Sequence, residues 1–205
     1  MRRKDYLFPI VILCLAMLLP LSGCRTIFGF KYGMTQPREE TPEELTSFLA
    51  KNQFPLHDLY QFSDSTAYFQ AIRNRVFRKN MLSHMIFDRD GQLLERDTNQ
   101  CQWAGYTFVR DLKRDTSYQI FPGFKVNTIT DHIKPFGDHS DTIAPDPDFT
   151  IVITWAKFIG KYNQRLFVLS RAVAENKTAV IRMIYLNIDM QKSWKLTKSQ
   201  KFSFQ

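Results

Sequence analysis

The sequence predicts an α/β domain built on a mixed β-sheet, and three observations predict it. Two apolar runs, at residues 149–155 and 179–188, have the length and β-branched composition of strands that are buried on both faces of a sheet. The residues between them carry apolar side chains at helical spacing, so the three segments form a βαβ unit. An Asp-Gly pair at residues 90–91, flanked by apolar runs, predicts a β-hairpin because this dipeptide tolerates positive φ.

The segment 1–23 has the organisation of a secretory signal peptide. A basic start from Arg2 to Lys4 precedes an apolar run from Tyr6 to Leu19, an order that is typical of secretory signals. The apolar run is too short to serve as a lasting membrane span. The sequence therefore predicts an exported protein.

Residues 21–24, Leu-Ser-Gly-Cys, close this segment and resemble the lipobox of bacterial lipoproteins. The resemblance implies cleavage before Cys24 and attachment of diacylglycerol to its thiol, so that acyl chains such as palmitate hold the protein in the membrane. Arg25 follows, whereas lipoproteins retained in the inner membrane carry aspartate there. We therefore expect an outer-membrane protein that faces the periplasm, or a cell-membrane protein in a host with one membrane. An ordinary secretory signal that ends in Gly-Cys is the alternative.

After the signal, the chain has the size of one domain. Residues 24–40 contain two glycines and a proline without sustained periodicity, which predicts a tether from the lipid to a single domain at residues 41–205. Among the three cysteines, Cys14 leaves with the signal and Cys24 carries lipid, so Cys101 is the remaining free thiol. This usage excludes a disulfide framework and a metal site built from several cysteines.

The chain is moderately basic, with 28 Lys and Arg residues against 20 Asp and Glu residues. Because nucleic acid is a poor partner for an exported protein, this charge predicts contact with anionic lipid or an acidic partner, unless it only forms a solvated surface. The densest basic clusters are Arg73, Arg75, Arg78 and Lys79, and the C-terminal Lys192, Lys195, Lys198 and Lys201.

Two helices are predicted before the hairpin. Residues 41–44, Thr-Pro-Glu-Glu, form a capping box with proline at the first helical position, so a helix begins at Pro42. A second helix is expected from Asp64, and its apolar face consists of Tyr68, Phe69, Ile72 and Val76.

Two further helices are predicted after the hairpin. The first carries Cys101, Ala104, Phe108 and Leu112 on one face. The second, inside the βαβ unit, extends from Gly160 to near Asn176. Between them, residues 115–147 contain several prolines and glycines and are expected to wrap the surface without regular structure.

Residues 149–189 resemble the first half of a thioredoxin, with an apolar strand ending in Trp155-Ala156, a turn, a helix and a second strand ending in Leu-Asn-Ile-Asp. The hairpin and helix of residues 81–113 resemble the second half but precede the first. The resemblance implies a four-stranded mixed sheet with flanking helices, in which the ββα unit precedes the βαβ unit as in a circular permutation. Cysteine-poor domains of this kind are similar to those of lipoproteins from Bacteroidota-type bacteria.

In the thioredoxin family, the turn after the first strand has the form Trp-Ala-x-x-Cys-x-x-Cys, and its first cysteine reacts as a thiolate at a helix N-terminus. In this chain Ile159 and Tyr162 occupy the cysteine positions, and residues 81–83 stand where the family places a cis-proline. We therefore expect no disulfide exchange. The degenerate turn leaves a candidate binding rim at the carboxyl ends of the strands, where open α/β sheets bind ligands. Packing of the helix N-terminus is the alternative role of this rim, whose residues are Trp155, Lys157, Phe158, Ile159 and Tyr162.

Two other places offer residues for chemistry. Cys101 is a candidate for a single-cysteine thiol or peroxide enzyme, although its position in an apolar stripe favours burial. The loop 131–148 could ligate a divalent metal, although its residue spacing matches no defined motif and solvated loops have a similar composition. Its candidate ligands are Asp131, His132, Asp138, His139, Asp141, Asp146 and Asp148. His57 and His84 are expected to be structural.

The function expected from the sequence is that of a membrane-anchored envelope lipoprotein whose non-redox domain binds a protein or peptide, or acts as a scaffold. No catalytic residue, metal or cofactor is expected. The expected partners are the membrane, through Cys24, and an envelope protein. The single-cysteine enzyme and the loop metal site form the alternative class of function.

Overall fold

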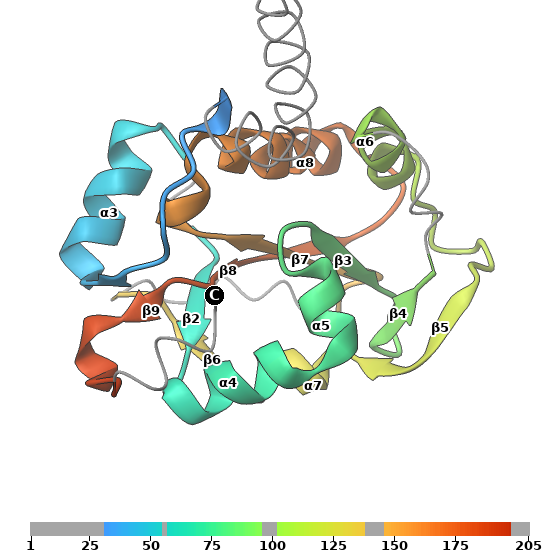
Figure 1. Ribbon diagram of the computed structural model, residues 1–205. Coiled ribbons are helices and arrows are strands. Elements are labelled where there is room, and N and C mark those ends of the chain that lie inside the picture. Colours follow the sequence, from blue (N-terminus) through green and yellow to red (C-terminus); the bar gives the residue numbers. More distant parts are fainter. Residues whose placement is uncertain (1–30, 55–56, 96–101, 138–145, 198–205) are drawn as a thin grey trace, which may run out of the picture.

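The computed structural model describes residues 31–54, 57–95, 102–137 and 146–197, and for residues 102–104 the backbone only. A mixed sheet of seven strands lies between two layers of helices (Figure 1). The α/β class, the mixed sheet and the flanking helices are therefore confirmed. The sheet has seven strands, however, where the sequence predicts four.

The large sheet has the strand order β5-β4-β3-β7-β8-β2-β6, and β1 and β9 form a separate pair. β8 is parallel to both of its neighbours, β7 and β2, and the other pairings of the large sheet are antiparallel. The strands are β1 (Glu39–Glu40), β2 (Leu59–Phe62), β3 (His84–Phe87), β4 (Gln92–Leu94), β5 (Ile120–Lys125), β6 (Ile133–Pro135), β7 (Phe149–Trp155), β8 (Ile181–Asn187) and β9 (Met190–Gln191).

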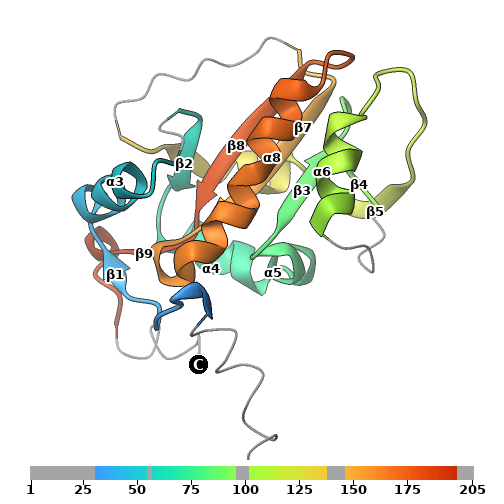
Figure 2. The same ribbon diagram turned by 90° about the horizontal axis from the view of Figure 1, so that it is seen from above.

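Helices cover both faces of the sheet. Figures 1 and 2 show α8 and α6 side by side on one face, α4, α5 and α7 on the other, and α3 near β1 and β9. The helices are α3 (Pro42–Lys51), α4 (Ser65–Arg73), α5 (Arg75–Asn80), α6 (Gln102–Arg110), α7 (Asn127–Thr130) and α8 (Asn163–Glu175), with 3-10 turns η2 (Lys157–Tyr162) and η3 (Lys192–Trp194). None of the helices in the described ranges is both long enough and apolar enough to cross a membrane.

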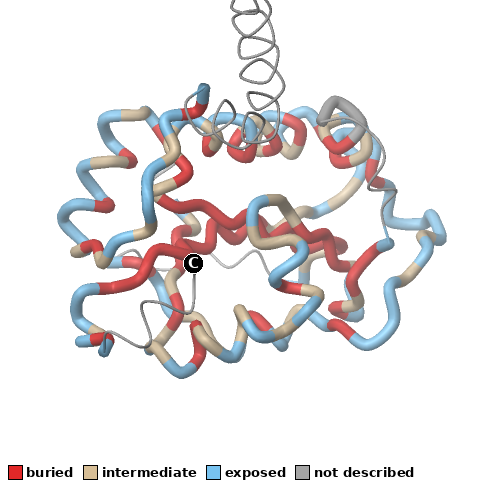
Figure 3. The backbone as a smooth tube through the Cα atoms, in the orientation of Figure 1, coloured by how far each residue is buried: buried red, intermediate tan, exposed pale blue. Residues whose placement is uncertain are grey.

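The βαβ unit is confirmed and forms the centre of the molecule. β7 has the predicted bounds, every one of its residues is buried, and it pairs in parallel with β8 along its whole length. Figure 3 shows the buried positions concentrated along these central strands. A strand covered on both faces needs apolar side chains at successive positions, which explains the uninterrupted apolar run.

The predicted hairpin is also confirmed. β3 and β4 pair antiparallel, and Gly91 between them has a φ of 72°. The carboxylate of Asp88 accepts a hydrogen bond from the backbone N–H of Gln92 at 2.7 Å, which closes the turn.

The predicted capping box at the start of α3 is confirmed, but the second helix is shorter than expected. Thr41 Oγ1 accepts a hydrogen bond from the N–H of Glu44, and the Glu44 carboxylate accepts one from the N–H of Thr41. α4 begins after its cap Asp64 and ends at Arg73, because Asn74 leaves the helical conformation and caps α5 instead. Val76 therefore belongs to a separate helix, and the prediction of one continuous helix is wrong.

The expectation that residues 115–147 lack regular structure is also wrong. This segment supplies β5 and β6, which are the two edges of the large sheet, and the short helix α7 between them. β2 is a further strand that the sequence analysis misses. It lies inside the sheet, parallel to β8 and antiparallel to β6.

Candidate functional site

The predicted rim lies at the carboxyl end of β7, but two of its five residues belong to the core. Trp155 is fully buried, and its indole N–H donates to the carbonyl of Tyr185 at 3.3 Å. Ile159 is buried as well, whereas Lys157, Phe158 and Tyr162 are half-buried. The structure places Trp155 at the end of β7 and the other four in the following turn, η2, without exposing the five as one surface.

A buried asparagine fixes the shape of this turn. Asn163 Oδ1 accepts from the N–H of Ala156 at 3.2 Å, and its Nδ2 donates to the carbonyls of Ala156 at 2.7 Å and Gly160 at 2.8 Å. Because these bonds satisfy buried backbone groups, Asn163 holds the chain where β7 ends and α8 begins.

Residues 31–40, which we call the strap, lie across the turn. The N–H of Thr35 donates to the carbonyl of Phe158 at 2.8 Å, and the ring of Tyr32 packs edge-on against Tyr162 with 5.4 Å between centroids. The ammonium group of Lys157 pairs with the buried carboxylate of Glu40 at 2.5 Å. Part of the segment expected to be a tether therefore covers the predicted rim.

A buried polar cluster lies under the strap at the end of β8. The Asp189 carboxylate accepts from the N–H of Lys157 at 2.7 Å and from Asn187 Nδ2 at 2.9 Å, both through Oδ2. Its Oδ1, like Gln191 Oε1, has no hydrogen-bond partner among the described residues. Burial raises the pKa of Asp189 to about 6, since the charged form loses its hydration.

Two of the carboxylates described in the loop 131–148 form structural contacts, whereas Asp131 and His132 lie at the end of α7, with Asp131 exposed. Asp146 pairs with Arg89, and Asp148 pairs with Arg114 at 3.2 Å while accepting from the N–H of Val180 at 2.9 Å. The described residues contain no group of three or more His, Cys, Asp and Glu side chains placed to hold a metal ion. Asp138, His139 and Asp141, named as candidate ligands, lie outside the described residues.

The two cysteines of interest, Cys24 and Cys101, also lie outside the described residues. His57 is described, and its Nδ1 lies 2.9 Å from the carboxylate of Asp58 at the surface. His84 begins β3 and lines a cavity that the sequence analysis does not anticipate.

This cavity, which we call the β3 pocket, has a volume of about 400 Å³. β3 and β4 pair through Phe87 and Leu93. The pocket opens beyond this pair, where the two strands are no longer paired. Its floor is apolar and includes the buried Met85, Ile86 and Leu94. The volume is within the usual range of ligand pockets, roughly 300–1,000 Å³.

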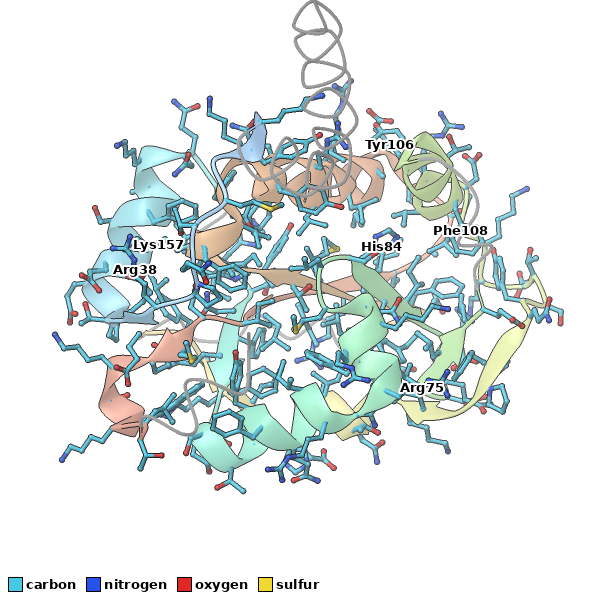
Figure 4. All side chains as sticks on the ribbon, in the orientation of Figure 1. Arg38, Arg75, His84, Tyr106, Phe108 and Lys157 are labelled. Carbon is cyan, nitrogen blue, oxygen red and sulfur yellow. The ribbon has the colours of Figure 1, made fainter. Side chains whose placement is uncertain are left out.

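The wall of the β3 pocket combines cations with aromatic rings. Arg75 and Lys79 stand four residues apart on α5 and therefore on one side of it, and both are exposed. Phe108 of α6 and Phe121 of β5 complete the wall, and Phe121 is one of the three large apolar side chains that are exposed in the described ranges. Figure 4 shows Arg75, His84 and Phe108 on one side of the molecule and Lys157 beside α3 on the other.

The charge of the pocket wall is mainly positive. Neither Arg75 nor Lys79 forms an ion pair with another described residue, and Glu95 is the acidic residue of the lining. Both cations belong to the basic cluster found in the sequence. The other two members of that cluster, Arg73 and Arg78, are exposed outside the lining.

A second cavity, of about 450 Å³, lies at the start of β7, where Phe149 is one of its lining residues. Its cations Arg89 and Arg114 are paired with Asp146 and Asp148, and its lining also contains Asp88, Asp90 and Asp115. The β3 pocket is therefore the better candidate for an anionic ligand. Comparison of the chain with protein-family models, with curated proteins and with solved structures finds no match.

Proposed function

We propose that this chain is a lipid-anchored envelope protein whose domain binds an acidic peptide segment of a partner protein in the β3 pocket. The observation that carries the proposal is the placement of Arg75 and Lys79, without carboxylate partners among the described residues, above an apolar floor. Guanidinium and ammonium groups bind carboxylates, and the floor accepts an apolar side chain of the same peptide. The domain acts by binding and performs no disulfide exchange.

The proposal includes a thioredoxin-like core in permuted order. Support comes from four adjacent strands, β4-β3-β7-β8, in which β7 and β8 are parallel and β3 is antiparallel to both β4 and β7. The placement of α6 and α8 on the same face also supports it (Figure 2). β2, β5 and β6 are additions to that core.

The proposed anchor is a diacylglyceryl group on Cys24, which places the domain in the periplasm at the outer membrane, or at the cell membrane of a host with one membrane. Two or three acyl chains hold a protein firmly, whereas one chain binds a bilayer weakly. A Cys24→Ser variant is expected to accumulate as an uncleaved precursor, and globomycin is expected to cause the same accumulation of the native chain. Normal maturation of the variant contradicts the anchor.

Peptide binding is tested with the mature lipidated protein in detergent micelles. The probe is a fluorescein-labelled peptide, Glu-Glu-Phe-Glu-Glu-Leu, and its counterpart with glutamine at every glutamate; fluorescence anisotropy reports binding. Removal of two charge-assisted contacts in an Arg75→Gln/Lys79→Gln variant is expected to weaken binding of the acidic peptide at least about tenfold.

The matched control is Arg73→Gln/Arg78→Gln, which removes the same charge from exposed residues outside the pocket lining. This control is expected to bind within about twofold of the native protein, since the corresponding free-energy change is under 1 kcal/mol. Equal losses in the two variants, or equal binding of the glutamine peptide, contradict a specific acidic-peptide pocket.

A further inference from the structure

Basic and aromatic side chains gather where the strap meets the start of α8. The guanidinium group of Arg165 lies 4.8 Å from the ring centroid of Tyr32, and the ammonium group of Lys31 lies 5.7 Å from the same centroid. Tyr162 packs edge-on against Tyr32, and Lys161 precedes it in the chain. We call these five residues the α8 cluster. Tyr32 itself is buried, so the groups that the cluster exposes are the cations of Lys31, Lys161 and Arg165. Such cations are attracted to anionic headgroups.

The charge of this face is positive along the helix. Between residues 157 and 175 the sequence contains a single carboxylate, that of Glu175. Glu175 pairs with Arg171 at 3.0 Å, one turn before the end of α8. On the neighbouring helix, Arg110 pairs with Asp111 at 2.8 Å, so that pair adds no net charge. Lys161 and Arg165 therefore add positive charge to a stretch of sequence whose single carboxylate is already paired.

The length of the chain before the strap brings this face near the lipid. Six residues separate Cys24 from Lys31, and a fully extended chain of that length spans at most about 25 Å. The strap begins beside the first turns of α8 in both views of the ribbon (Figures 1 and 2), and its Tyr32 contacts Arg165 there. An anchor on Cys24 therefore keeps the α8 cluster within reach of the headgroup layer.

We propose that the α8 cluster docks the domain on anionic headgroups of the leaflet in which Cys24 is anchored, an inference that rests on the proposed lipid anchor. The positive charge of the cluster and its short connection to Cys24 both favour an anionic bilayer as the surface that it binds. α5 lies on the opposite face of the sheet from α8 (Figure 1). Docking through α8 thus leaves Arg75 and Lys79 on the side of the sheet turned away from the membrane.

The test uses the mature lipidated protein in vesicles with a photo-reactive p-benzoylphenylalanine at Gln164, an exposed position between Lys161 and Arg165. The same probe at Thr128, exposed on α7 at the opposite face, is the positional control. We expect lipid adducts from position 164 in vesicles that contain phosphatidylglycerol, at least about tenfold fewer in pure phosphatidylcholine, and few from position 128.

Two charge variants complete the test. Lys31→Gln/Lys161→Gln is expected to lower the adduct yield at position 164 at least about fivefold, since both lysines attract the anionic headgroups. Lys125→Gln/Lys134→Gln, which removes exposed lysines from β5 and β6, is expected to leave the yield unchanged.

Three results overturn the proposal: similar yields at positions 164 and 128, a yield at position 164 that ignores phosphatidylglycerol, or, in intact cells, a protein adduct in place of a lipid adduct. The mass of the N-terminal peptide from the same preparation reports acylation of Cys24 independently. A missing anchor and a missing docking face therefore give different results.

Discussion

The carbonyl oxygen of Tyr32 lies so close to Gly160 that a Cβ at position 160 would overlap it. Gly160 also has φ 55° and ψ −133°, a conformation that side chains rarely adopt. The strap can cross the η2 turn only because glycine stands at this position. The η2 turn and the strap above it are thus fitted to each other.

A Gly160→Ala variant is therefore expected to lose stability and to release the strap. The backbone conformation alone costs on the order of 2 kcal/mol, and the overlap with the strap adds to it. Urea unfolding measures the loss, and limited proteolysis reports the exposure of residues 31–40. Gly123→Ala is the matched control, because Gly123 has a φ of 81° with open space around it. Equal losses of stability in Gly160→Ala and Gly123→Ala contradict the close approach of the strap to Gly160.

We expect Asp189 to make the stability of the domain depend on pH. Its folded-state pKa of about 6 lies above the ordinary value of 3.8, so its contribution is fully present below pH ~4 and is lost as the pH rises through about 6. The two-unit difference corresponds to roughly 3 kcal/mol. An Asp189→Asn variant, which is neutral at all pH values, is expected to be more stable than the native protein at pH ~8 by about that amount.

Urea unfolding of the native protein and of Asp189→Asn between pH ~4 and ~8 checks this prediction. The two free energies of unfolding are expected to converge at the acidic end, where Asp189 is protonated. A variant that is less stable than the native protein at the alkaline end contradicts the assignment.

Asn176 joins α6, α8 and the start of β8. Its Nδ2 donates to the carbonyls of Val109 at 3.0 Å and Leu112 at 2.9 Å, and its Oδ1 accepts from the N–H of Thr178 at 2.8 Å. An Asn176→Ala variant removes the acceptor of the Thr178 and Ala179 N–H groups and one donor from each of the two carbonyls. It is expected to cost about 2–4 kcal/mol. Asn52→Ala, which removes one local bond to Phe48, is expected to cost about 1 kcal/mol or less. Thermal unfolding of the two variants provides the comparison.

Trp155 ends the central strand β7, and no part of it is exposed. A Trp155→Ala variant is expected to lose about 3–5 kcal/mol of folding free energy, because a large ring leaves a cavity. Trp155→Phe keeps a ring and is expected to lose less. If chemical unfolding shows that the free energy of unfolding of the alanine variant is within about 1 kcal/mol of the native value, the burial of Trp155 in the core is contradicted.

Thiol–disulfide activity is expected to be absent. Exchange needs an attacking thiolate and, in a dithiol enzyme, a second sulfur to resolve the mixed disulfide. Ile159 and Tyr162 supply neither at the η2 turn. Insulin reduction with dithiothreitol is expected to stay at background for the native protein and for Cys101→Ser. Rapid reaction of Cys101 with a thiol reagent in the folded protein supports the single-cysteine enzyme instead.

The central elements could be predicted because their signals are local. The apolar run of β7, the Asp-Gly turn and the capping box at Thr41 each depend on residues a few positions apart. The edge strands depend on distant partners. β5 contains Pro122 and Gly123, which normally indicate a loop, and it pairs only because β4 lies beside it.

The candidate site could likewise be predicted only where its signals are local. The sequence reveals that Arg75 and Lys79 belong to a basic cluster, since charge is a property of the residues themselves. The pocket beneath them depends on where the ladder of β3 and β4 stops and on the distant Phe121. Likewise, glycine and proline in residues 24–40 suggest a flexible tether, and the pairing of Glu40 with Lys157 is visible only in three dimensions.

The strap also determines how the domain responds to mechanical load. Tension on the N-terminal segment reaches the contact between Thr35 and Phe158 and the two-residue pairing of β1 with β9 before it reaches the large sheet. These few bonds are expected to break before the large sheet unfolds, because the continuous pairing of β7 with β8 distributes the load over seven residue pairs. A pull on the N-terminal segment would then uncover the η2 turn while the core stays folded.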